Sequence, residues 1–220
     1  MTHSTTAFFT AIVVATLAIA GTCDAQMPAT PVLQNAWANA GITIAADYGK
    51  ARDESAFAGA LAWAPAESRF QLSAGAGFVK ADSGGSQGAY GARLSIPLLN
   101  FASGSLGTAI FGGVGVTAKS GVTRSSFPVG VALGYRHALG TTRGISAYVT
   151  PFYTIARIKG DTSSKPTGGA IRASVGLDVT VAPQLGVTLG YEMGADAKAG
   201  HPGPRGGVFG VGVSYALHRQ

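Results

Sequence analysis

The chain contains a stretch of strict two-residue alternation that restricts it to a β-sheet with two unlike faces. In residues 174–193, apolar side chains at every second position alternate with small, polar or charged ones, and Pro183 and Gln184 interrupt the pattern. Successive side chains of a β-strand point to opposite faces, so the stretch predicts two strands joined by a tight turn. One face of this hairpin is apolar and the other is polar and small. The class of protein depends on which face is turned inward.

The same alternation recurs along the chain and predicts ten strands in total. The expected strands are residues 42–50, 56–64, 69–79, 89–98, 106–118, 127–139, 144–158, 171–182, 185–193 and 208–217. Longer polar connections alternate with shorter ones, which is typical of a membrane barrel with outer loops and tight periplasmic turns. We therefore predict an all-β fold, a transmembrane antiparallel up-and-down β-barrel of about ten strands, with eight strands as the alternative.

The composition of the polar face favours a barrel whose apolar side faces lipid. The chain has 33 glycines among 220 residues, and only 12% of its residues are charged. A solvated outer surface is typically rich in charged side chains, whereas the interior of a narrow barrel requires small ones. Aromatic residues also gather near both ends of the expected strands, as they do at the two interfaces of a membrane.

Charged residues on the polar face predict a network inside the barrel, because buried charges need partners. The six residues are Asp47, Arg93, Arg136, Arg172, Asp178 and Glu192. In the hairpin that turns at Pro183, residues whose numbers sum to about 367 are expected to pair. This register places Glu192 opposite Val175 and one diagonal step from Arg172, so we predict a contact between Arg172 and Glu192.

The N-terminus predicts export from the cytoplasm. Residues 7–20 form an apolar run of signal-peptide length, and small residues at Cys23 and Ala25 favour cleavage before Gln26, with Ala18 and Ala20 as an alternative site. We predict a signal peptide at 1–25, a periplasmic N-terminal lead at 26–40 and a barrel domain at 41–220. Cys23 is the only cysteine, so cleavage after Ala25 leaves a mature chain without one.

The sequence shows no motif that indicates catalysis. It lacks a nucleophile elbow, a phosphate-binding loop, a paired-cysteine site and a His-x-x-His spacing. We therefore expect no enzymatic activity, no cofactor, no metal and no nucleic-acid partner. The formal net charge is +6, and cations of the expected outer loops suggest contact with lipopolysaccharide phosphates, for which we select Lys119 and Arg124.

The C-terminal stretch GVGVSYALHRQ is similar to the assembly signal of bacterial outer-membrane barrels. Gly212, Tyr215 and Leu217 match its glycine and its spaced aromatic and apolar positions, although three further residues, 218–220, follow. The exported chain as a whole resembles small opacity-type outer-membrane β-barrels. This resemblance implies a location in the bacterial outer membrane, recognition of the C-terminal strand by the barrel-assembly machinery, and a structural or surface-interaction role. A narrow porin-like channel and a soluble exported barrel that binds an apolar ligand are the two alternatives.

Overall fold

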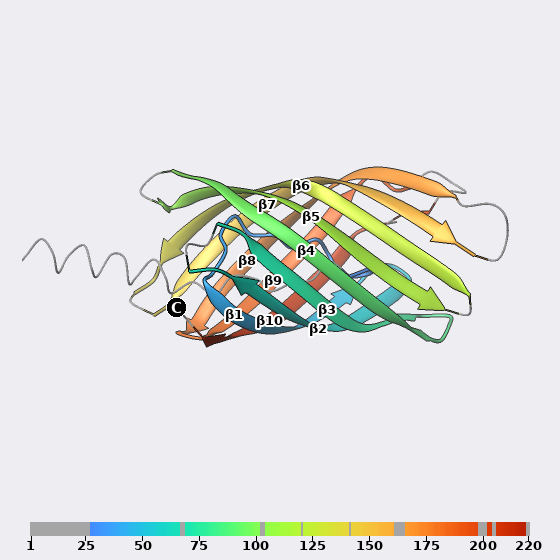
Figure 1. Ribbon diagram of the computed structural model, residues 1–220, viewed down its shortest axis with the longest axis horizontal. Coiled ribbons are helices and arrows are strands. Elements are labelled where there is room, and N and C mark those ends of the chain that lie inside the picture. Colours follow the sequence, from blue (N-terminus) through green and yellow to red (C-terminus); the bar gives the residue numbers. More distant parts are fainter. Residues whose placement is uncertain are drawn as a thin grey trace, which may run out of the picture.

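The chain folds into a closed antiparallel barrel of ten strands (Figure 1). The computed structural model describes residues 27–66, 69–101, 104–119, 121–140, 142–160, 166–197, 202–203 and 206–218. Its strands are β1 (Gly41–Lys50), β2 (Glu54–Ala64), β3 (Gln71–Ala81), β4 (Ser86–Phe101), β5 (Leu106–Lys119), β6 (Val122–Ala138), β7 (Gly144–Lys159), β8 (Thr167–Ala182), β9 (Leu185–Gly194) and β10 (Val208–His218). Each strand pairs with its neighbours in the sequence, and β1 pairs with β10 to close the barrel. The predicted fold is confirmed, with ten strands and not eight.

The apolar face of each strand points outward. Tyr48, Phe57 and Phe78 lie side by side on β1, β2 and β3, are 41%, 49% and 48% exposed, and the last two rings stack at 5.9 Å. Near the opposite end, Trp63 and Phe70 meet edge to face at 5.5 Å. These positions form aromatic belts at two interfaces, as in outer-membrane barrels. The alternative of a soluble barrel is wrong, because its apolar face would have to be buried inside.

No helix in the described part of the chain is long and apolar enough to cross a membrane.

The hairpin predicted for residues 174–193 is formed by β8 and β9, but its pairing register is displaced by one residue. A register shift between Thr180 and Ala182 places Glu192 opposite Ser174 and not opposite Val175. The displacement follows from an irregularity next to the turn, which sequence spacing does not reveal. Pro151 on β7 causes no register shift, since its pairing with Ala173 continues the ladder on both sides.

The connections at the two ends of the barrel differ less than the sequence suggested. A long polar connection was expected between β5 and β6, but the strands continue through it, and only residues 120–121 separate them. Thr117 pairs with Arg124, so this polar stretch belongs to the β5–β6 ladder and extends it beyond the apolar belt. Long connections remain at residues 160–166 and 195–207, at the end of the barrel opposite the tight turn of residues 183–184.

Candidate functional site

The lumen of the barrel is occupied by the chain's own N-terminal segment, which we call the lumen segment and define as residues 27–40. The sequence predicted a periplasmic lead for residues 26–40, and the structure instead places the described part of it inside the ring of strands (Figure 1). Val32, Leu33, Gln34 and Asn35 are at most 5% exposed, and their contacts are with strands on different sides of the barrel. The physical reason is the small-residue inner face, which leaves room for a further segment of chain.

Glycines of the barrel wall provide the space for this segment. A Cβ atom on Gly49 would lie 2.3 Å from the backbone oxygen of Ala29, and one on Gly190 would lie 2.1 Å from a methyl of Leu33. Near the end of the barrel that holds the tight turn 183–184, Cβ atoms on Gly107 and Gly134 would lie 2.7 Å and 2.6 Å from the Trp37 ring. These distances are far below van der Waals contact, so the wall and the segment fit each other only because these positions lack side chains.

A buried ion pair binds the segment inside the lumen. Arg172 on β8 donates through Nε to Glu192 Oε1 on β9 at 2.5 Å, so the predicted contact is present. The second carboxylate oxygen of Glu192 accepts the backbone N–H of Val32 at 2.8 Å. Arg172 also donates to the carbonyls of Ala195 and Gly206 at 3.2 Å and 2.6 Å. The pair therefore joins the lumen segment to the wall and to the β9–β10 connection.

Arg93 and Thr150 bind the next two residues of the segment from other sides of the barrel. Arg93 on β4 donates to the carbonyl of Leu33 at 2.6 Å and to Gln34 Oε1 at 3.2 Å. Thr150 on β7 donates to the carbonyl of Gln34 at 2.9 Å. Next to these bonds, Val32 packs against Phe111 and Phe152. Polar and apolar contacts thus surround the segment.

Asn35 anchors the segment nearer the tight-turn end. Its amide Nδ2 donates to Asp178 Oδ2 at 2.5 Å and to Ser146 Oγ at 2.9 Å. The other oxygen of Asp178 accepts the Thr188 hydroxyl at 2.9 Å. Because Asp178 is only 1% exposed, these bonds satisfy a carboxylate that would be costly to bury alone.

Trp37 marks the end of the occupied region. The Arg136 guanidinium lies 4.9 Å from the centroid of the Trp37 ring, a cation–π geometry, and its Nε donates to the carbonyl of Gly104 at 2.7 Å. Arg136 is part-buried here at the rim. Its guanidinium therefore covers one face of the indole near the tight-turn end.

The predicted lumen charges all lie on the inner side of the wall, and their arrangement differs from the network expected. Arg172 and Glu192 pair directly, and Asp47 is buried on β1. Arg93, Arg136 and Asp178 contact residues 33–37, and the sequence pattern did not predict these contacts. The missed residues are Val32, Leu33, Gln34, Asn35 and Trp37. A detectable signal was the composition of PVLQNAW, which is apolar and amide-rich where a solvated linker is usually charged or serine-rich.

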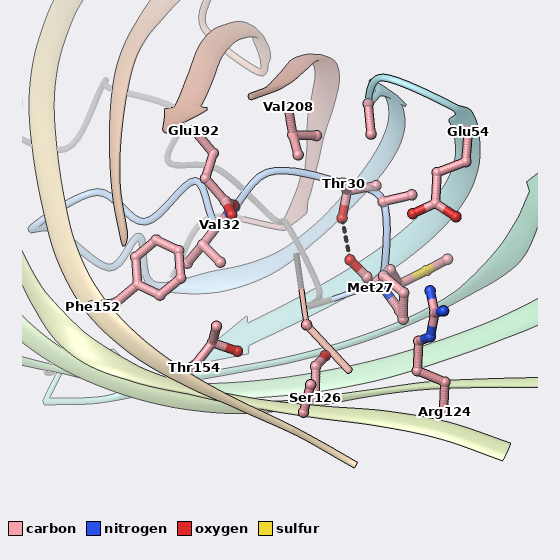
Figure 2. A pocket seen from close by; sticks show the side chains of 15 residues that line it. Met27, Thr30, Val32, Glu54, Arg124, Ser126, Phe152, Thr154, Glu192 and Val208 are labelled. Carbon is pink, nitrogen blue, oxygen red and sulfur yellow. Dashed lines mark hydrogen bonds between the residues drawn. The ribbon is translucent and has the colours of Figure 1, made fainter. Parts of the chain in front are cut away.

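A cavity of about 100 Å³ lies beside the start of the lumen segment (Figure 2). Its apolar side is formed by Met27, Val32 and Phe152, and Glu54 and Arg124 lie on its polar side. Figure 2 shows the Arg124 side chain rising from its strand towards Met27. Arg124 lies an even number of residues before the buried, inward positions Pro128 and Ala132 of β6. Its side chain therefore faces the mouth of the barrel and not the surrounding lipid.

Other predicted site residues are placed as follows. The backbone of Lys119 ends β5, and its side chain lies outside the described residues. Gly212 is buried on β10 opposite Asp47, whereas Tyr215 and Leu217 point outward and are 42% and 52% exposed. The predicted signal peptide and its predicted cleavage site also lie outside the described residues. Within the described ranges, no group of three or more His, Cys, Asp or Glu side chains is placed to hold a metal ion.

A closed barrel with an apolar exterior, two aromatic belts and a polar interior defines an integral β-barrel of the bacterial outer membrane. The model of the outer membrane protein beta-barrel domain family matches residues 55–216, and the chain belongs to this family. No curated protein matches the chain significantly.

Solved structures with similar folds include an autotransporter β domain, a surface protein and a porin. The β domain of the Bordetella autotransporter BrkA has a TM-score of 0.50 at 11% identity, with 80% of this chain and 98% of that chain covered. Neisserial surface protein A has a TM-score of 0.40 at 16% identity, with 81% and 98% covered. The KdgM porin, in complex with disordered oligogalacturonate, has a TM-score of 0.41 at 13% identity, with 80% and 99% covered. At these identities the likeness concerns the fold alone.

Proposed function

We propose that this protein is a non-enzymatic structural or surface-interaction protein of the outer membrane whose barrel is closed to solutes. The observation that carries this proposal is the hydrogen-bonded lumen segment. Residues 32–35 contact β4, β7, β8 and β9, which lie on different sides of the barrel. A conducting pore through a ten-stranded barrel would require water where the side chains of residues 32–35 lie. The occupied lumen favours this role over the porin-like alternative.

Single-channel recording in a planar bilayer tests the proposal. The mature protein is expected to give no steady conductance, and a variant lacking residues 27–37 is expected to give one. Heat-shifted mobility in electrophoresis verifies that both proteins are folded barrels. Steady conductance of the intact protein, at the level of the deletion variant, would show that the segment does not close the lumen and would favour the porin-like alternative.

A second part of the proposal concerns the outer leaflet. Lys50, Lys80 and Arg157 lie on the outward faces of β1, β3 and β7, just beyond the apolar belt at the long-loop end. Their depth supports a contact with lipopolysaccharide phosphates, because exposed cations near a lipid head-group layer attract its phosphates. They replace Arg124, which points into the mouth, as candidates for this contact. Lys50 also forms an exposed ion pair with Asp82 at 2.9 Å, which holds its ammonium at the rim.

Native extraction followed by quantification of bound lipopolysaccharide tests this contact. The double variant Lys80→Gln/Arg157→Gln is expected to retain less lipid than the unchanged protein. Arg143→Gln is the matched control, because Arg143 is an exposed cation at the opposite end of the barrel. Equal retention by all three proteins would refute the contact.

We also propose that the barrel-assembly machinery recognises β10. The support is that β10 is one partner of the closing pair, and that Tyr215 and Leu217 lie together on its outward face. Tyr215→Ala/Leu217→Ala is expected to slow the appearance of the heat-shifted form in cells, whereas the inward change Ser214→Ala is expected to leave it unchanged. Equal rates for the two variants would count against this recognition.

A further inference from the structure

The lumen segment crosses the barrel in a definite direction. Its first residue, Met27, packs against Ala56, Ala58, Val79 and Ala89, which lie at the start of β2, the end of β3 and the start of β4. All of these positions are at the long-loop end. The later residues of the segment bind the wall near the tight-turn end, so the segment runs from the long-loop end towards the tight-turn end.

The later contacts fix the exit of the segment. Asn35 binds Ser146 near the start of β7 and Asp178 near the end of β8, and Trp37 lies against Gly107 at the start of β5. These positions are at the tight-turn end, where β1 begins. The segment therefore runs the length of the lumen before the chain turns into the wall.

The long-loop end is the outer end of the barrel. In outer-membrane barrels the turns on the periplasmic side are short and the loops outside are longer. Here the two longest connections, residues 160–166 and 195–207, lie at one end together with the short connection 120–121, and the turn 183–184 lies at the other end. Both termini of the barrel wall, the start of β1 and the end of β10, are at the tight-turn end, as expected for the periplasmic side.

We infer that the mature chain threads through its own barrel and presents its N-terminus at the cell surface. Cleavage after Ala25 would leave Gln26 as the first residue, directly before Met27 at the outer mouth. The N-terminus then belongs to the same outer face as Glu54 and Arg124, which line the mouth cavity with residues 27–30. The inference depends on the direction of the segment and not on whether the lumen conducts.

The geometry of the mouth supports a fixed path for this chain end. Thr30 donates through its backbone N–H and its hydroxyl to the carbonyl of Met27, at 3.3 Å and 2.8 Å, and Ala29 adopts a positive φ of 64°. The resulting turn (Figure 2) packs directly against the backbone of Gly49, where a side chain would collide with the Ala29 carbonyl. The start of the segment is thus held at the mouth by a defined turn and not only by apolar packing.

Cysteine labelling of intact cells tests the inference. In a Cys23→Ser background, Pro28→Cys places a thiol at the part-exposed start of the segment, and Asn39→Cys places one at its part-exposed end. A maleimide carried on a polyethylene glycol of several kilodaltons cannot cross the outer membrane. Pro28→Cys is expected to react on intact cells, and Asn39→Cys only after the outer membrane is opened. The reverse pattern, or reaction of Pro28→Cys only after opening, would overturn the inference.

An epitope inserted between Ala25 and Gln26 gives a second, independent reading, with the same epitope after Gln220 as the matched control. Antibody binding to intact cells is expected for the first insertion, and binding only after permeabilisation for the second. Heat-shifted mobility verifies that each variant is folded. Detection of the N-terminal epitope only after permeabilisation or only after boiling would overturn the inference, whatever the conductance of the protein.

Discussion

Removing the charge of Glu192 is the perturbation whose effect the structure defines best. Glu192→Gln keeps the shape of the side chain and one acceptor oxygen for the Val32 N–H, but it leaves the guanidinium of Arg172 without its counter-charge. Arg172 is 1% exposed and Glu192 is 4% exposed. Loss of one partner of a buried pair costs about 3–5 kcal/mol. We expect the lower end, about 3 kcal/mol, because Arg172 keeps the carbonyls of Ala195 and Gly206 as acceptors.

Urea unfolding of the protein in detergent, followed by heat-shifted mobility, measures this cost. With a urea dependence of about 2 kcal/mol per molar, a loss of about 3 kcal/mol lowers the midpoint by about 1.5 M. Arg172→Met is expected to be similarly destabilising, and the double variant Glu192→Gln/Arg172→Met to lose less than the sum of the two single changes. The exposed pair Lys50–Asp82 is the control, and Asp82→Asn is expected to cost less than about 1 kcal/mol. An unchanged midpoint for Glu192→Gln, or a double variant equal to the sum, would refute the reasoning.

Three further changes test the fit between the segment and the wall. Gly49→Ala is expected to destabilise the barrel by about 1–3 kcal/mol, because its Cβ would meet the Ala29 carbonyl at 2.3 Å; the control Gly112→Ala has no atom within 4 Å of its Cβ, and equal urea midpoints for the two would contradict the fit. Asn35→Ala removes the two hydrogen bonds that the Asn35 amide donates to Asp178 and Ser146. It is expected to lower the free energy of unfolding by about 1–3 kcal/mol and to produce brief openings in bilayer recordings, and a silent, fully stable variant would disprove this. Trp37→Ala is expected to open space at the tight-turn end of the lumen, so that a maleimide reacts faster with Asn39→Cys in detergent. An unchanged reaction rate would show that the indole does not restrict access at this end.

The wall of the barrel was predictable from the sequence because its signal is local. In residues 174–193 every second side chain is apolar, and the structure turns those side chains outward. The contact of Arg172 with Glu192 was also predictable, because a hairpin with a two-residue turn limits which residues meet. The exact register was not, since the shift between Thr180 and Ala182 depends on how the turn packs.

The lumen segment was not predictable by the same reasoning, because its contacts are long-range and its backbone is irregular. Val32 meets Glu192 and Asn35 meets Asp178 across more than a hundred residues of sequence. Neither residue belongs to a periodic pattern, so periodicity assigns the region to a linker. Its composition was informative, since apolar and amide side chains without charges are poorly suited to a solvated lead.

The lumen segment also explains why the polar face of this barrel is so rich in glycine. Side chains of the wall fill the interior of many small barrels, but a Cβ on Gly190 or Gly134 would overlap Leu33 or Trp37. The remaining charged residues then act as clamps, because Arg93, Asp178 and Glu192 each bind a backbone or amide group of the segment. A wall of small residues with a few placed charges is therefore what an inserted chain requires. Glycine-rich inner faces preceded by an apolar, amide-containing N-terminal stretch are the sequence feature by which the same arrangement can be sought in other barrels.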